Sequence, residues 1–448
     1  MEIAIKLFQF ILSISILVIL HELGHFLPAK WFKTKVEKFY LFFDPWFSIA
    51  KKKIGETEYG IGWLPFGGYV KIAGMVDESM DTEQLKQPAQ PWEFRAKPAW
   101  QRLIIMLGGV TVNFFLAWII YGCLSFFNGE TTFDTTKVDT PMHYTNVAKA
   151  MGFKDGDKIL KVDGKTQNNL DKLSLDILLS DQVTVLRDGK ETTFNTNDDG
   201  KALAFKDENP KGFLTPRYAA VIDTIINPKT AEAGLKVGDQ VVSANGQKIN
   251  YYDEFQTAVG KSAGKPINIE VLRNGSVQPL SIPVSKEGTI GIASYKQLEK
   301  YASTQHFTFG QSIGRGFTRS IESLTYQVKQ FKLIFNKKVQ GYKKVGGPLA
   351  IIKNMPVDQS KDGSISINWT AFWSFTAMFS VWLAFLNLIP IPGLDGGHVI
   401  FTLYEMIVGK PVPQKVLENA QMVGVIFLLG LMLVIFGSDI FKALTGNL

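Results

Sequence analysis

The sequence predicts an α-helical polytopic membrane protein with four transmembrane helices and two tandem β-rich domains inserted between the second and third helices. Three observations carry this prediction: four long apolar runs, a lysine-rich segment after the first run, and an internal repeat in the polar middle of the chain. The 448 residues are 46% hydrophobic and 20% charged. Because the hydrophobic residues are gathered into runs, they can supply membrane spans as well as a soluble core.

The first apolar run, within residues 1–29, predicts a membrane-spanning helix that carries three unusual side chains, His21, Glu22 and His25. Its start resembles a signal peptide, but no small-residue cleavage site follows, so we interpret it as a retained helix. A charged residue inside a membrane helix costs about 2.5 kcal/mol or more. Ionisable residues at such a depth are therefore candidates for function.

The spacing of these three residues favours a metal site. Positions i and i+4 share one face of a helix, so His21 and His25 can converge on one metal ion. Glu22 lies about 100° around the helix from His21, where it can accept a proton from a metal-bound water. Zinc lowers the pKa of such a water to about 7 and polarises a carbonyl. The alternative, two surface histidines on a charged helix, fits the apolar surroundings poorly.

Residues 30–99 form a polar, lysine-rich segment, which the positive-inside rule places in the cytoplasm. Within it, residues 59–72 are rich in glycine and aromatic residues and contain one proline. This stretch predicts a short hairpin or an edge strand, with a plain structural turn as the alternative.

Residues 100–127 are the second predicted transmembrane helix. Gly108, Gly109 and Asn113 favour close helix packing and an interhelical hydrogen bond there. We expect these residues to have a packing role without chemistry.

The net charge of +7 could indicate a nucleic-acid partner. However, the lysines are scattered or flank apolar runs, which positive-inside topology explains better, so we expect no nucleic-acid partner. The single cysteine, Cys123, excludes both an intrachain disulfide and a thiolate metal cluster.

The polar middle of the chain contains a repeat: residues 152–164 (GFKDGDKILKVDG) recur as residues 234–246 (GLKVGDQVVSANG). Asp-Gly and Asn-Gly turns, alternating apolar residues and a helical stretch after each copy predict two small β-rich domains, residues 128–215 and 216–297. The pattern resembles bacterial PDZ domains, which bind an extended peptide at a sheet edge. A role as steric spacers remains the alternative.

Residues 298–364 contain apolar side chains at helical spacing with basic residues between them. This pattern predicts an amphipathic helix that lies either on a domain or on the membrane surface.

The third apolar run, residues 365–395, ends in the sequence Asn387-Leu-Ile-Pro-Ile-Pro-Gly-Leu-Asp395-Gly-Gly-His398. The prolines and glycines interrupt the helix, and broken backbone at membrane depth marks a site. Asp395 is the natural third metal ligand, whereas His398 is a weaker candidate that we expect near the site or exposed. A cytoplasmic loop, residues 396–420, and a fourth span, residues 421–441, complete the prediction.

The predicted topology brings the two halves of the metal site together. With the segment after the first span in the cytoplasm, both termini and the β-rich domains lie outside. The first and third spans then both run inward, so that Asp395 and the histidine pair meet towards the cytoplasmic face.

In combination, these motifs resemble the RseP-type bacterial site-2 proteases over essentially the whole chain. The carrying features are His21-Glu22-x-x-His25, the motif from Asn387 to Asp395 and two PDZ-like domains between the second and third spans. One departure is visible in residues 109–114, which lack the proline expected after the first glycine of the family's second-span motif.

The resemblance implies an intramembrane zinc metalloprotease of the bacterial inner membrane. It implies one zinc ion held by His21, His25 and Asp395, with Glu22 as the catalytic base. Asn387 would position the substrate, and residues 60–72, with Gly67, Gly68 and Tyr69, would form a membrane-re-entrant β loop that pairs with the unwound substrate.

The substrates implied are single-span membrane proteins already trimmed outside, such as an anti-sigma factor of envelope stress signalling, and remnant signal peptides. The lipid bilayer and peptide ligands of the PDZ-like domains are the other partners expected. Two competing functions are a membrane metal transporter or sensor with the same ligands and a catalytically silent scaffold. Neither explains why Glu22 lies beside the histidines.

Overall fold

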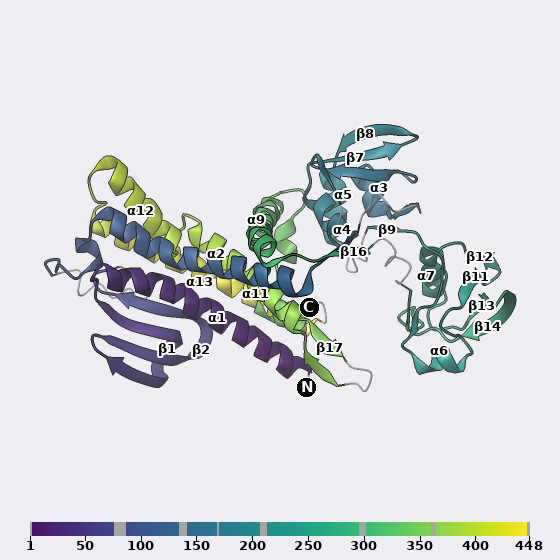
Figure 1. Cartoon of the computed structure of the whole chain (residues 1–448), viewed down its shortest axis with the longest axis horizontal. Helices are drawn as coiled ribbons and strands as arrows, with labels where there is room; N and C mark the ends of the chain where they lie inside the picture. The colour runs from purple at the N-terminus through teal and green to yellow at the C-terminus, as the bar shows by residue number, and fades with distance from the viewer. Residues whose placement is uncertain are drawn as a thin grey trace. The chain divides into compact units, whose positions relative to one another are not determined.

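The computed structural model describes residues 2–75, 87–133, 141–167, 170–206, 213–294, 302–359 and 364–445 (Figure 1). The chain divides into two compact units. One contains Met1–Gly129, His306–Lys329 and Lys344–Leu448, and the other contains Glu130–Gln305 and Gln330–Lys343. The first unit holds the long apolar helices and the second holds the repeat.

Four helices of the first unit are long and apolar enough to cross a membrane. They are α1 (Glu2–Trp31), α2 (Ala99–Asn128), α11 (Trp369–Leu388) and α13 (Gln414–Leu444). At 1.5 Å per residue, even the 20 residues of α11 cover about 30 Å, the thickness of the hydrocarbon layer. The four predicted membrane helices are therefore confirmed, and the chain is a multi-pass membrane protein.

Glycines bring α1 and α2 into backbone contact, and the two helices lie side by side in Figure 1. A Cβ atom on Gly24 would overlap the carbonyl of Gly108, and one on Gly108 would overlap the carbonyl of Gly24. Small residues allow such close approach between membrane helices. The contact places the histidine-bearing turns of α1 directly against α2.

The segment after α1 folds into a long antiparallel hairpin of β1 (Val36–Ile54) and β2 (Thr57–Ile72). Both strands bend, so residues 36–41 pair with residues 58–61 on one side and with residues 68–72 on the other. Residues 48–54 pair only with residues 57–62, and residues 68–72 pair only with residues 36–41. Residues 68–72, here called the edge arm, therefore pair on one side only among the described residues and form one edge of this small sheet.

This hairpin corrects the prediction for residues 30–99. The stretch 59–72 is not a hairpin by itself but most of one strand, as in the edge-strand alternative, and its partner is β1 in the preceding lysine-rich segment. Phe42 and Trp46 have left-handed φ angles of 68° and 72°, which turn β1 through a corner and interrupt its alternating pattern. For this reason the sequence pattern does not predict β1 as the partner of β2.

The expected loop of residues 396–420 is also wrong in part, because it contains α12 (Asp395–Val408) and the first turns of α13. The third span ends as a helix at Leu388, and Asp395 opens the next helix instead of closing the third span. An ion pair between Arg102 of α2 and Glu405 attaches α12 to the bundle.

The amphipathic segment forms α9 (Phe309–Ile334), which confirms the helix. Its Ser312 and Gly316 lie against α2, where Trp118 Nε1 donates a hydrogen bond of 2.7 Å to the carbonyl of Ile313. Shorter elements follow: α10 (Pro348–Lys353), β17 (Val357–Gln359) and β18 (Ile365–Ile367). The carboxylate of Asp439 in α13 accepts hydrogen bonds from the N–H groups of Gly347 and Leu349, 2.8 and 3.0 Å long, at the start of α10.

In the second unit, each copy of the repeat builds a four-stranded antiparallel sheet with the same strand order. The sheets run β6-β5-β7-β8 and β12-β11-β13-β14. The first uses β5 (Lys158–Val162), β6 (Lys165–Thr166), β7 (Gln182–Arg187) and β8 (Lys190–Asn195). The second uses β11 (Gln240–Ala244), β12 (Gln247–Lys248), β13 (Ile267–Arg273) and β14 (Ser276–Ile282).

Each sheet is covered by helices around its own hydrophobic core. The helices are α3 (Asn146–Met151), α4 (Leu170–Leu179) and α5 (Asp198–Lys206) in the first copy, and α6 (Pro228–Glu232) and α7 (Tyr252–Lys261) in the second. Short pairs complete the unit: β3 (Glu130–Phe133) with β16 (Ala302–Gln305), β4 (Met142–Tyr144) with β9 (Leu214–Pro216), and β10 (Thr224–Ile225) with β15 (Ile292–Ala293). The helical stretches predicted after each repeat are α4 and α7.

The repeated motifs encode a buried ion pair in each sheet. Arg187 contacts the fully buried carboxylate of Asp157 at 2.7 Å, and Arg273 contacts that of Asp239 at 2.6 Å. The aspartate of the repeated Gly-Asp therefore pairs with an arginine 30 residues later in the first copy and 34 residues later in the second.

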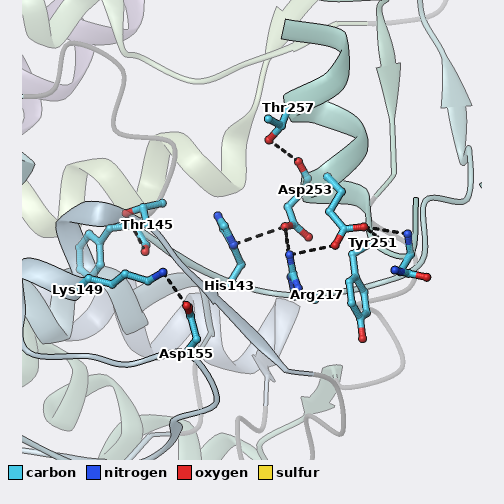
Figure 2. Close-up of polar contacts among 11 residues, drawn as sticks. His143, Thr145, Lys149, Asp155, Arg217, Tyr251, Asp253 and Thr257 are labelled. Atoms are coloured by element: carbon cyan, nitrogen blue, oxygen red, sulfur yellow. Dashed lines mark hydrogen bonds and ion pairs between the residues drawn. The ribbon is translucent and has the colours of Figure 1, made fainter. Parts of the chain in front are cut away.

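A polar cluster connects the two copies within the second unit (Figure 2). Arg217, which follows β9, lies 2.7 Å from Asp253 at the start of α7 and packs over the ring of Tyr251, 4.6 Å from its centre. His143 of β4 lies 3.4 Å from the same carboxylate. Residues of the β4–β9 pair thus hold the first turn of α7.

Candidate metal centre

His21 and His25 of α1 and Asp395 of α12 bring three potential ligand atoms within 4.8 Å of one another. Asp395 Oδ2 lies 3.3 Å from His21 Nε2 and 3.2 Å from His25 Nε2. The two Nε2 atoms are 3.3 Å apart. Both histidines are buried, with 7% and 4% of their surfaces exposed. The predicted candidates therefore lie together, although α12 follows α1 by more than 300 residues.

The break between α11 and α12 carries Asp395 to this position. After Leu388 the chain leaves the helix, passes Pro390 and Pro392, and re-enters a helix at Asp395. Proline cannot donate the main-chain hydrogen bond of a helix interior, so the break follows from the sequence. Gly396 and Gly397 pack against carbonyl groups of the broken segment, where a Cβ atom would overlap them.

Residues of α2 orient the two imidazoles from behind. His25 Nδ1 lies 2.8 Å from the carbonyl oxygen of Ile105, and His21 Nδ1 lies 3.1 Å from Nδ2 of Asn113. A Cβ atom on Gly109 would overlap His25 Nε2 and lie 2.6 Å from His21 Cε1. Gly109 therefore leaves the space that the rings occupy, and α2 contributes more than the helix packing that we expected of Gly109 and Asn113.

Asn387, near the end of α11, also reaches the cluster. Its Nδ2 lies 3.1 Å from His21 Nε2, on the side of the ring that faces Asp395. The amide therefore lies beside the same ring nitrogen that faces Asp395.

Glu22 lies beside the cluster and faces the edge arm. The main chain of Val70 lies close to its carboxylate. A Cβ atom on Gly68 would lie 2.6 Å from Val18 Cγ1, which shows how closely the arm approaches α1. The edge arm of the small sheet thus lies next to Glu22, the residue expected to act as a base.

The other two residues predicted in this stretch lie at the bend of β2. A Cβ atom on Gly67 would lie 2.9 Å from Phe43 Cε2. The hydroxyl of Tyr69 donates a hydrogen bond of 2.9 Å to Asp44 Oδ1, and its ring stacks on Tyr40 with 5.3 Å between ring centres. These contacts organise the sheet.

His398 lies one turn after Asp395 and contacts Gln421 of α13. It is not among the three clustered ligand residues. This position agrees with the expectation that His398 is not a fourth ligand.

The donor set fits zinc. Two imidazoles and one carboxylate are a common set of three protein ligands, which leaves a fourth position for water or substrate. Asp395 Oδ2 is buried and has no hydrogen-bond donor among the described residues. A buried carboxylate oxygen without a donor is costly, and a cation between it and the two Nε2 atoms would satisfy it.

The chain matches the model of Peptidase family M50 over residues 9–431. A putative zinc metalloprotease of Clostridium perfringens is 27% identical over 431 residues, which cover 96% of this chain and 97% of that protein. The Regulator of sigma-E protease RseP of Escherichia coli is 27% identical over 446 residues, with 95% and 96% covered. A putative zinc metalloprotease of Vibrio cholerae is 28% identical over 462 residues, with 96% and 97% covered.

These matches cover both the helices that build the candidate centre and the repeat. The cofactor is zinc, as the names of the relatives and the donor set agree. The chain belongs to Peptidase family M50 and is a zinc metalloendopeptidase.

Proposed function

We propose that this protein hydrolyses peptide bonds within the membrane-spanning segments of single-span proteins. The observation that carries the proposal is the cluster of buried His21 and His25 with partly buried Asp395, among helices that are long and apolar enough to cross a membrane. A hydrolytic site at that depth is suited to a substrate that is itself in the membrane.

In this proposal His21, His25 and Asp395 hold one zinc ion. Bound zinc supplies a Lewis acid that polarises the scissile carbonyl and lowers the pKa of water to about 7. Glu22 takes a proton from the attacking water and delivers it to the leaving amine, the usual double role of a general base and acid. Its place beside the histidine pair and next to Val70 supports this assignment.

The edge arm and Asn387 would hold the substrate. A peptide bond in a helix is shielded by the helix's own hydrogen bonds, so cleavage requires local unwinding and new main-chain partners. Residues 68–72 pair on only one side and lie beside Glu22. An unwound substrate can add to this arm as a further strand, and the amide of Asn387 can position its scissile bond.

We infer an inner-membrane location in which residues 30–99 and the α12 region face the cytoplasm. Both termini and the repeat would then lie outside. The many lysines of residues 30–99 support this orientation, and it places the candidate centre towards the cytoplasmic side.

The two repeat sheets would be PDZ-like domains that limit access from outside. Their shared strand order and the helix after each second strand support the resemblance. Several relatives are named as regulator of sigma-E protease, which supports an anti-sigma factor trimmed outside, or a remnant signal peptide, as substrate. Deletion of residues 128–300 should permit cleavage of an untrimmed substrate, and unchanged selectivity would refute the filter.

The position of the cleaved bond tests the proposed function. The full chain in detergent micelles is incubated with a single-span model substrate, and the products are measured by mass spectrometry. We expect one or a few cleavages within the apolar segment, abolished by a zinc chelator. Cleavage only in the polar flanks, or cleavage that survives removal of zinc, would contradict the proposal.

A further inference from the structure

We propose that Asn113 is a positioning residue that selects the metal-binding tautomer of His21. This inference rests on the proposed ligand set and adds a residue outside it. Asn113 is fully buried in the middle of α2, where a polar side chain without a partner is costly. Its amide contacts Nδ1 of His21, the ring nitrogen that faces away from Asp395.

At His25 the hydrogen-bond partner determines which ring nitrogen carries the proton. Its Nδ1 lies 2.8 Å from the carbonyl oxygen of Ile105. A carbonyl oxygen can only accept, so the proton of neutral His25 sits on Nδ1. Its Nε2, which faces Asp395 and His21, is left with a lone pair for a metal ion.

His21 has a partner that can act in two ways. Ile105 and Asn113 lie about two turns apart on the same helix, so α2 offers one hydrogen-bonding group to each ring. The side-chain amide of Asn113 has a donor, Nδ2, and an acceptor, Oδ1. Each orientation of the amide therefore favours a different tautomer of His21.

In this structure the donor of the Asn113 amide, Nδ2, faces His21. Nδ2 lies 3.1 Å from Nδ1 of His21, while the other ring nitrogen, Nε2, lies 3.3 Å from Asp395 Oδ2 and 3.1 Å from Asn387 Nδ2. In this arrangement Asn113 Oδ1 is buried and has no hydrogen-bond partner among the described residues. A half-turn of the amide would place Oδ1 against Nδ1, stabilise a proton there and free Nε2 for zinc.

The chemistry of an amide explains why asparagine suits this position. Its neutral acceptor, Oδ1, can hold a proton on Nδ1 of His21, whereas a carboxylate would add a second buried charge close to Asp395. A hydrogen bond of 2.7 Å from Ser380 Oγ to the main-chain oxygen of Asn113 fixes the backbone. The side chain can therefore turn while α2 stays in place.

Zinc affinity of the purified full chain tests the inference. Mutation of a residue that orients a metal-binding histidine lowers metal affinity by about 10- to 100-fold. Asn113→Leu should therefore weaken zinc binding by that factor. The zinc affinity is measured by competition with a chromophoric chelator. Asn113→Asp keeps an acceptor and should bind zinc within about threefold of the original protein or more tightly. The visible spectrum of bound cobalt should change in Asn113→Leu and be largely retained in Asn113→Asp.

Ser380→Ala is the matched control, because it removes a hydrogen bond to the same residue without touching His21. It should leave the zinc dissociation constant unchanged. If Asn113→Leu does not fold, Asn113→Gln, whose amide is displaced by one methylene, replaces it and should bind zinc more weakly than Asn113→Asp.

The outcomes separate this inference from the proposed function. Failure of the original protein to bind one zinc ion would refute both. Zinc bound with equal affinity by the original protein and the Leu or Gln variant would refute the role of Asn113 alone. Equal weakening in Ser380→Ala would also refute it, because helix packing would then explain the effect.

Discussion

His25 Nε2 and Asp395 Oδ2 lie 3.2 Å apart, and each belongs to a helix whose other contacts hold it in place. α1 is fixed against α2 by the Gly24–Gly108 contact, and α12 is joined to α2 through Arg102 and Glu405. The candidate centre is thus split between two helices that both use α2 as their support. Each contributing helix can be tested separately.

Replacement of Asp395 by alanine should remove most of the bound zinc. Two imidazoles would remain, and we expect zinc affinity to fall by more than about 100-fold, beyond the effect of an indirect partner. Zinc is counted by mass spectrometry after gel filtration. Tyr404→Phe, at an exposed position of the same helix, is the control, and full zinc in Asp395→Ala would show that the third ligand is elsewhere.

Substitution of Gly109 by alanine should disturb the histidines without removing a ligand. The added methyl group would overlap His25 Nε2 and lie 2.6 Å from His21 Cε1, so the rings must move. We predict about tenfold or greater loss of zinc affinity. Gly122→Ala in the same helix meets only Ser312, at 3.3 Å, and should bind zinc normally. Normal binding by both variants would mean that the rings adopt another position.

The substitution Gly68→Ala in the small sheet tests substrate binding separately from metal binding. In Gly68→Ala the new Cβ would lie 2.6 Å from Val18 Cγ1 and from the oxygen of Tyr40, which pushes the edge arm away from α1. We expect kcat/KM for a single-span substrate to fall by about tenfold, equal to about 1.4 kcal/mol, with zinc content unchanged. Gly55→Asn, at the open hairpin tip with φ 62°, is the control. Unchanged cleavage by Gly68→Ala would contradict a role for the arm.

The buried ion pair of the second repeat copy should make its stability depend on pH. Burial would raise the pKa of Asp239, but hydrogen bonds from Arg273 and the N–H of Lys236 outweigh it and hold the pKa below its ordinary value. The pair therefore stabilises the fold above the unfolded-state pKa of about 3.9. This contribution is lost as the pH falls through the lower pKa of the folded state.

Hydrogen exchange of β13 measures this effect. At pH 7, Arg273→Leu should lower the free energy of opening by about 3 kcal/mol, because Asp239 is left buried without its cation. The difference between the two proteins should shrink towards pH 3. Lys149→Leu, which breaks the exposed pair with Asp155, should cost less than about 1 kcal/mol. A constant difference across the pH range would exclude the titration of Asp239 as its cause.

Much of this architecture could be predicted from patterns along the sequence. Long apolar runs predicted the four helices, the repeat predicted two similar sheets, and charge placement predicted that Asp395 would meet the histidine pair. Each of these features depends on composition and spacing along the chain, which the sequence shows directly.

The remaining features depend on how elements rotate and bend in space. Asn113 was interpreted as a packing residue, because nothing in an apolar run shows which face of α2 meets the rings of α1. The Gly24–Gly108 contact sets that face. Similarly, no strand was predicted for residues 36–54, since left-handed residues at the corner of β1 interrupt its alternation. The pairing with β2 became visible only in the fold.

The substitution Glu22→Gln tests the central claim most directly, because it removes a proton acceptor and keeps the three proposed ligands. Zinc content and cleavage of a single-span substrate are measured on the same preparation. The account predicts one zinc ion per chain and a loss of cleavage of at least about 100-fold, the lower range for general acid–base catalysis. Retained cleavage with full zinc would contradict the proposed mechanism.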